Sequence, residues 1–156
     1  MTRPDADDPM NKKLLPLAVL GFSTDHSVTG ITRFQKLVFL AQNETVDETP
    51  YEFTPGSYGP YSTPLYEDIT LLAQRNFIRE RGEHLSPHTN QNTSIYELTE
   101  KGERALVRSL ATDDPDIPQE AFDEIVTKYS EMPLWDLLEY VYAEYPNMAA
   151  NSNLPF

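Results

Sequence analysis

Thr32-Arg33-Phe34-Gln35-Lys36-Leu37 opens the stretch of sequence that decides the fold, which continues with Tyr58-Gly59-Pro60-Tyr61-Ser62 and ends with Tyr96-Glu97-Leu98-Thr99-Glu100-Lys101-Gly102. The first string has the apolar spacing of a helix, and the second is a tight turn into another helix. The third is a strand that runs directly into a helix. With a polar hairpin before the third string, this order is typical of a winged helix-turn-helix, a fold that binds nucleic acid or protein partners and rarely carries chemistry.

The periodicity around these strings predicts a mainly α chain with a small antiparallel β-wing, an α+β fold. Helices are expected over about 10–22, from Thr32 to about residue 41, and from Ser62 or Thr63 onwards. Strands are expected at 77–81 and 94–98, on either side of a polar loop that forms the wing. A short strand is also expected at 51–53, with a turn at 23–30 and another that Pro55-Gly56 and Gly59-Pro60 bracket. A further helix is expected from Thr99 to about residue 111.

The acidic and proline-containing segments divide the chain. Residues 1–9 have the composition of a disordered N-terminus, and residues 10–111 are expected to form the winged-helix core. An acidic linker is predicted over 112–118, a C-terminal helical pair over 119–146 and a tail over 147–156.

The charge is the most unusual compositional feature: 12 basic against 25 acidic residues give a net charge of −13 over 156 residues. Residues 75–108 alone are not acidic, with six basic and five acidic groups. A body this acidic repels phosphate in ordinary buffer, but at molar salt the Debye length falls to about 3 Å and the repulsion largely disappears. The acid-rich, lysine-poor composition therefore suits a halophilic source, or else an acidic protein that avoids nucleic acid.

The composition also limits where the protein is expected in the cell and which reactions it could catalyse. The chain has no cysteine, its longest apolar run is too short to span a membrane, and its acidic N-terminal flank is wrong for a signal peptide. We therefore expect a cytoplasmic protein with no membrane association. No phosphate-binding loop, nucleophile elbow or metal-ligand spacing is present, which favours a protein that is not an enzyme and needs neither cofactor nor metal.

Three arginines are the candidate DNA-binding residues. Arg75 ends the third predicted helix, and Arg79 and Arg81 lie on the first wing strand, where a winged helix contacts phosphates. The alternative is that they pair with nearby glutamates, and for these three the two interpretations stand level. For Lys101, Arg104 and Arg108 we favour pairing with neighbouring acids. Glu67 and Asp68 on the third helix are poorly suited to reading base edges.

Five other residues are candidates for binding a partner. Arg33 and Lys36 fall on the helix face opposite the apolar one, and together with Gln35 they form either a solvated face or a partner contact. Three tyrosines, Tyr58, Tyr61 and Tyr66, surround the Gly-Pro turn. The tyrosines either lock the turn against the core or line a recess for a partner. Trp135 and Tyr142 lie off the leucine stripe of the last helix and suit either the core or a homodimer contact.

The three strings together resemble the Panacea domain, the SocA-like antitoxin family, and its YwgA-like relatives, in a haloarchaeal-type form. The resemblance covers about residues 10–110. It implies a winged-helix-like fold in a family that includes antitoxins, which neutralise a toxin by binding it directly. It implies no catalytic residue.

Two functions follow as expectations. The first is a DNA-binding transcriptional regulator that uses the third helix and the wing. The second is an antitoxin-like or adaptor module that binds protein through the Arg33 and Lys36 face and the tyrosine turn.

Overall fold

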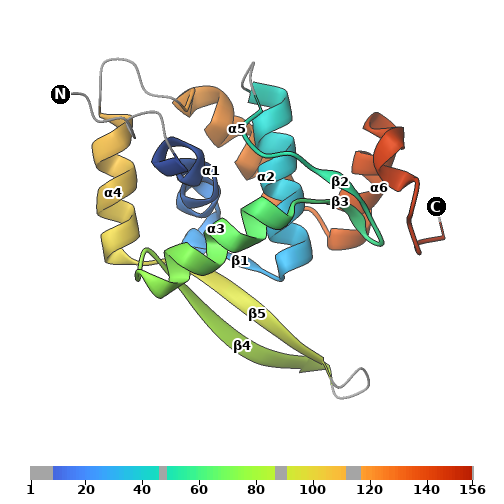
Figure 1. Cartoon of the computed structure of the whole chain (residues 1–156), viewed down its shortest axis with the longest axis horizontal. Helices are drawn as coiled ribbons and strands as arrows, with labels where there is room; N and C mark the ends of the chain where they lie inside the picture. Colours follow the sequence, from blue (N-terminus) through green and yellow to red (C-terminus); the bar gives the residue numbers. More distant parts are fainter. Residues whose placement is uncertain (1–8, 46–48, 87–90, 112–116, 156) are drawn as a thin grey trace.

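The computed structural model describes residues 9–45, 49–86, 91–111 and 117–155, and within them the chain is mainly helical α+β (Figure 1). Six α-helices combine with a three-stranded and a two-stranded antiparallel sheet. The elements are α1 (Pro9–Phe22), β1 (Ser27–Thr29), α2 (Ile31–Thr45), β2 (Thr54–Gly56), β3 (Gly59–Tyr61), α3 (Thr63–Gln74), β4 (Ile78–Ser86), β5 (Gln91–Leu98), α4 (Glu100–Leu110), α5 (Gln119–Ser130) and α6 (Leu134–Glu144). Short 3₁₀ turns cover Thr24–His26 and Pro146–Ala149.

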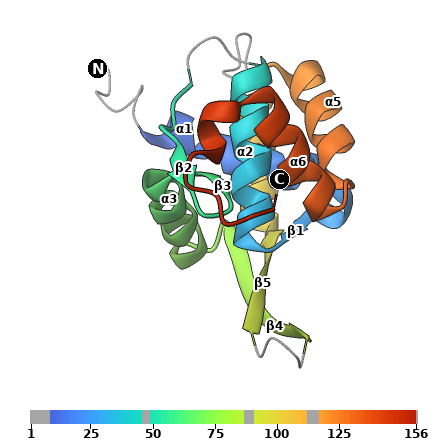
Figure 2. The ribbon, with the colours of Figure 1, turned by 90° about the vertical axis from the view of Figure 1, so that its right-hand side faces the viewer.

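Helix α2 is the centre of the fold, and other elements surround it (Figures 1 and 2). Every residue from Phe34 to Gln42 is buried, although the sequence of this segment is amphipathic. Helices α1, α5 and α6 and strand β3 all pack against it. A helix covered on every side must also bury its polar residues, and these then need hydrogen-bond partners inside the protein.

The three-stranded sheet has the order β1-β5-β4. Strand β1 pairs with β5 through Ser27–Glu97, Val28–Tyr96 and Thr29–Ile95. The sequence predicted only a turn over 23–30, because a three-residue strand is too short to show an alternating pattern. The strands predicted at 77–81 and 94–98 are confirmed and longer than expected, and β4 and β5 project from the body as a hairpin (Figure 1).

The second sheet corrects the prediction for residues 51–61. The strand expected at 51–53 is wrong, because β2 and β3 lie at 54–56 and 59–61, whereas the turn expected between Pro55-Gly56 and Gly59-Pro60 is confirmed at Ser57 and Tyr58. Proline is tolerated in both strands, since neither lies inside a wide sheet. Gly59 has φ +94°, a left-handed conformation in which glycine is unstrained.

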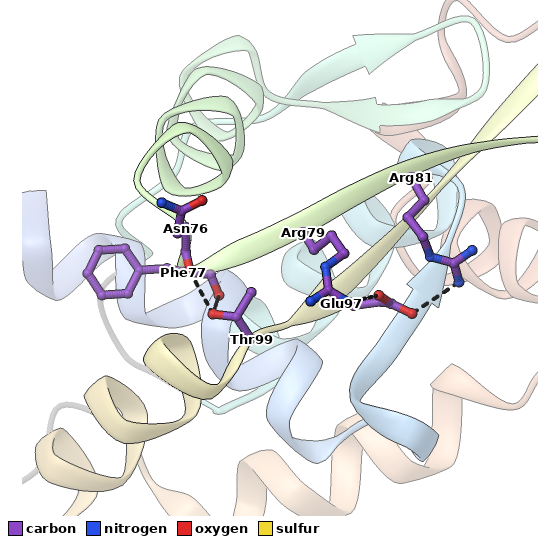
Figure 3. A network of polar contacts seen from close by, with 6 residues as sticks. All are labelled: Asn76, Phe77, Arg79, Arg81, Glu97 and Thr99. Carbon is purple, nitrogen blue, oxygen red and sulfur yellow. Dashed lines mark hydrogen bonds and ion pairs between the residues drawn. The ribbon is translucent and has the colours of Figure 1, made fainter.

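The segment from Tyr96 to Gly102 connects β5 to α4 and also contacts the end of α3. Thr99 caps α4 by accepting a hydrogen bond from the Gly102 amide, and its own hydroxyl lies 2.6 Å from the Asn76 carbonyl and 3.0 Å from the Phe77 carbonyl (Figure 3). Gly102 is required because a Cβ there would lie 2.2 Å from the Phe77 carbonyl oxygen. The predicted helix start after Thr99 is confirmed.

The C-terminal helices share the core of the rest of the chain. Phe122, Val126 and Leu137 are fully buried in the same cluster as the residues of α1 and α2. Beyond α6 the chain returns to the β2–β3 hairpin, where the Asn153 amide donates to the Ser57 carbonyl at 2.9 Å. The predicted disordered N-terminus and acidic linker lie mainly outside the described residues. Within the described residues, no helix has the length and apolar character that crossing a membrane requires.

Candidate functional site

Five basic residues gather around the base of the β4–β5 hairpin. We call them the basic strip: Arg75, Arg79, Arg81, Lys101 and Arg104. In its centre, Arg79 and Arg81 project from the same face of β4 and converge on Glu97 of β5 (Figure 3). The Arg79 and Arg81 guanidinium groups lie 3.4 and 3.0 Å from the two carboxylate oxygens. Hydrogen bonding from Arg81, with the charges of both arginines, lowers the pKa of Glu97.

The two arginines remain accessible although they share this partner. The side chain of Arg79 is 65% exposed and that of Arg81 is 49% exposed, against 27% for Glu97. Two guanidinium groups and one carboxylate leave a net positive charge on this face. The predicted pairing with a nearby glutamate is thus confirmed for Arg79 and Arg81, and both side chains still point to solvent.

An open groove connects this face to the end of α3 and the start of α4. It is lined by Thr70 and Gln74 from α3, Arg79 from β4, and Lys101 and Arg104 from α4. The Lys101 ammonium donates to the Arg75 carbonyl at 2.8 Å and lies over the Phe77 ring. Arg104 pairs loosely with Glu100 at 4.0 Å, as the helical spacing predicted. Within the described residues, the strip forms ion pairs with Glu97 and Glu100, and Glu80 also lines the groove.

The two faces of the hairpin differ in charge. Glu80 alternates with Arg79 and Arg81 and lies on the opposite face, where its carboxylate accepts hydrogen bonds from Ser94 at 2.9 Å and Tyr96 at 3.5 Å. Burial and the charge of Glu80 raise the pKa of Tyr96, and the charge of Tyr66 adds a smaller contribution. Tyr66 of α3 therefore lies near Tyr96. The structure therefore does not bring Arg79 and Arg81 onto the early exposed face of α3, which carries Glu67.

Two of the three candidate tyrosines lie together at the start of α3. Ser62 caps the helix, its hydroxyl accepting from the Leu65 amide, so Tyr61 precedes the cap and Tyr66 occupies the fourth helical position. Side chains at these two positions commonly pack against each other. Burial, followed by the charge of Tyr66, raises the pKa of Tyr61. Tyr58 lies in the turn at the other end of β3, about 10 Å away by strand geometry.

Lys36 is not on a solvated face, and that prediction is wrong. Its side chain is among the largest fully buried ones, because the β2–β3 hairpin and α6 cover the side of α2 opposite the apolar stripe. The ammonium donates to the Pro60 carbonyl at 2.9 Å. Burial lowers the pKa of Lys36 to about 7.

Arg33 is half-buried and contacts the end of α5. Its guanidinium donates to the Met132 carbonyl at 2.6 Å and more weakly to the Ser130 carbonyl. Burial lowers the pKa of Arg33, opposed by the charge of Glu131. Arg33 and Lys36, the two basic residues that the sequence suggested for partner binding, thus donate hydrogen bonds to backbone carbonyls of this chain.

Two buried glutamines of α2 do the same: Gln35, for which the expected solvated face is wrong, and Gln42, which the sequence did not single out. Gln35 is fully buried, accepts from the Ser62 amide at 2.8 Å and donates to the Ser62 carbonyl at 3.0 Å. Gln42 makes the same pair of bonds to Tyr51, at 3.1 and 2.8 Å. Their separation of seven residues, which places them on one helix face, is the signal that would have identified them.

The described residues contain no group of three or more histidine, aspartate or glutamate side chains placed to hold a metal ion. No family model matches the chain, and no curated protein sequence matches it at a significant level.

Proposed function

We propose that this protein is a non-enzymatic, winged-helix regulator that binds DNA through the basic strip, with α3 beside it. The order of elements supports a winged helix. Helix, strand, helix, helix, strand and strand follow one another in α1, β1, α2, α3, β4 and β5, and the sheet order is β1-β5-β4. The β2–β3 hairpin is an insertion between the second and third helices.

The observation that carries the DNA function is that Arg79, Lys101 and Arg104 line one groove, with Arg81 beside Arg79 on their shared partner Glu97, in a chain of net charge −13. Phosphate contacts need exposed cations, and exposed arginines on an accessible strand provide them. Thr70 and Gln74 line the same groove and carry the hydrogen-bonding groups that contact base edges. The acidic remainder of the surface keeps DNA away from other faces.

The test begins with a pool of genomic DNA fragments, from which the wild-type protein selects its ligands at high and at moderate salt. Affinity for a selected duplex is then measured by fluorescence anisotropy. The double variant R79E/R81E is expected to bind at least 100-fold more weakly. The matched control, R108E/K128E, makes the same change in net charge outside the strip and is expected to stay within about fivefold of wild type. Equal losses in both variants, or no selected DNA, would reject the DNA function.

A second candidate, an antitoxin-like or adaptor module that binds protein, is favoured by the exposed tyrosines. Tyr61 is 36% exposed and Tyr66 is 42% exposed. Both lie at the beginning of α3, where the Ser62 amide donates a hydrogen bond to the buried Gln35 side chain. Tyrosine is enriched where proteins bind one another, since it adds contact area at low entropic cost. The Arg33 and Lys36 part of the predicted surface is not included, because both side chains are engaged inside the fold.

A further inference from the structure

We propose that residues 52–61, which contain the β2–β3 hairpin, lie closed over Lys36 while its amine is neutral and open when the amine takes up a proton. We call this segment the flap. It carries Tyr58 and Tyr61, so its opening moves two tyrosines of the second candidate function, although the flap itself does not depend on that function.

Both ends of the flap are fixed to α2 by buried glutamines. Directly before the flap, the Gln42 side chain donates to the Tyr51 carbonyl at 2.8 Å and accepts from the Tyr51 amide at 3.1 Å. Directly after it, Gln35 makes the same pair of bonds to Ser62, at 3.0 and 2.8 Å. Amide side chains carry no titratable proton in the physiological range. The two ends can therefore stay in place while the segment between them moves.

Lys36 of α2 contacts the middle of the flap. Its Nζ donates to the Pro60 carbonyl at 2.9 Å, and a Cβ at Gly59 would lie 3.0 Å from its Cε. The same Cβ position lies 3.6 Å from Leu138 and 3.6 Å from Tyr142 of α6. The Lys36 side chain is 2% exposed, so the flap and α6 together enclose the amine.

The outer strand of the flap contacts the C-terminal segment (Figure 2). The Asn151 side chain donates to the Pro55 carbonyl at 3.1 Å, and the Asn153 amide donates to the Ser57 carbonyl at 2.9 Å. Two strands of three residues do not form a stable hairpin by themselves. The flap therefore keeps its structure only while its neighbours on both sides hold it in place.

The surroundings of Lys36 suit a neutral amine. No carboxylate of the described residues forms an ion pair with it. The flap, α6 and the adjoining turn of α2 carry tyrosines, exposed carboxylates and a second cation: Glu52, Tyr58, Tyr61, Asp136, Glu139, Tyr140, Tyr142, Glu144 and Arg33. Burial, without a contribution from a neighbouring charge, lowers the pKa of Lys36 to about 7. A proton on Lys36 thus creates a buried charge with no counter-ion, and opening of the flap hydrates it.

The magnitude follows from linkage between proton binding and opening. The pKa of the Lys36 amine is about 7 under the closed flap and 10.5 when it is exposed to water. The ratio of open to closed flap should therefore rise by about 50- to 100-fold from pH 9 to pH 6. Most of this rise lies above pH 7, because below pH 7 the closed form also takes up the proton.

The experiment is hydrogen–deuterium exchange of the full chain between pH 6 and 9, with each rate divided by the intrinsic exchange rate at that pH. Amides of the flap are expected to exchange faster than those of residues 34–42 in α2. Their protection should fall by about 50- to 100-fold from pH 9 to pH 6. In K36M, which keeps the length of the side chain without its charge, it should change less than about threefold. K128M, which removes an exposed lysine of α5, is the matched control and should behave as the wild type.

The wild type alone decides whether the flap opens separately. Flap amides that exchange no faster than those of residues 34–42 at every pH would show that they open only with the whole chain, and this would overturn the flap. Flap protection in the wild type that does not change with pH would overturn its control by a proton. The same pH dependence in K36M as in the wild type would remove Lys36 from that role.

Discussion

Replacing Glu97 by glutamine is expected to tighten DNA binding. In the free protein Glu97 accepts from both Arg79 and Arg81, at 3.4 and 3.0 Å, so these arginines must exchange or share this partner when they contact phosphate. Glutamine has nearly the same shape but no charge. The substitution therefore removes the ion pairs of Arg79 and Arg81 with Glu97 and a negative charge that repels DNA.

The magnitude follows from the two ion pairs that are lost. Exposed pairs contribute about 0.2–1 kcal/mol each, and these arginines are about half to two-thirds exposed. Release of both thus gives at most about 2 kcal/mol, a ceiling of about 30-fold in affinity. We expect a gain of about 3- to 10-fold in ordinary buffer. The gain should shrink at molar salt, where the pairs are already screened.

The assay is fluorescence anisotropy with a selected duplex, for the wild type, E97Q and a matched control, E120Q. Glu120 is exposed on α5, so its substitution makes the same change in net charge away from the strip. E120Q should change affinity by less than twofold. Weaker binding by E97Q, or equal gains in E97Q and E120Q, would refute the role of the arginine face.

Three further predictions concern the fold that supports these surfaces. The folded chain protonates Lys36 only below about pH 7, whereas the unfolded chain protonates it up to about pH 10.5, so stability rises with pH between these values. Relative to K36M, the wild type should gain about 2 kcal/mol in free energy of unfolding between pH 7 and 9. The measurement is urea unfolding at a series of pH values. Parallel plots of this free energy against pH for the two proteins would show that the ammonium is not buried. Q35L should lower the free energy of unfolding by about 2–4 kcal/mol, because it leaves both backbone groups of Ser62 without partners, and a loss below about 1 kcal/mol would contradict the contact. G102A should lower the free energy of unfolding by about 2–3 kcal/mol, because its Cβ would meet the Phe77 carbonyl. G82A is the control, with open space around its Cβ, and should change thermal stability little. Equal effects of the two substitutions would contradict the close packing of Gly102 against Phe77.

Much of the architecture was readable from local chemistry. The Ser62 and Thr99 caps, the apolar spacing of α2 and the alternation in the wing strands each act within a few residues, and these elements form where they were predicted. The three-residue strands β1, β2 and β3 were missed or displaced, because they exist only through pairing with partner strands.

The same difference between local and long-range determinants applies to the candidate functional residues. The exposure of Arg79 and Arg81 followed from their position on a polar strand, but their shared contact with Glu97 depends on the register between β4 and β5. Lys36 was misplaced because a helix periodicity gives the apolar face and does not reveal that the opposite face is also covered. Hydrogen bonds from buried polar side chains to distant backbone, such as those of Gln35, are fixed by tertiary packing alone.

The most direct test of DNA binding by the basic strip is the salt dependence of affinity. The logarithm of the association constant for a selected duplex is measured against the logarithm of KCl concentration, for the wild type and for R79A/R81A. Each arginine that contacts a phosphate contributes about 0.9 to the slope, so the double variant should lower the slope by about 2. An unchanged slope in R79A/R81A, with affinity equal to that of the wild type, would contradict DNA binding through this strip.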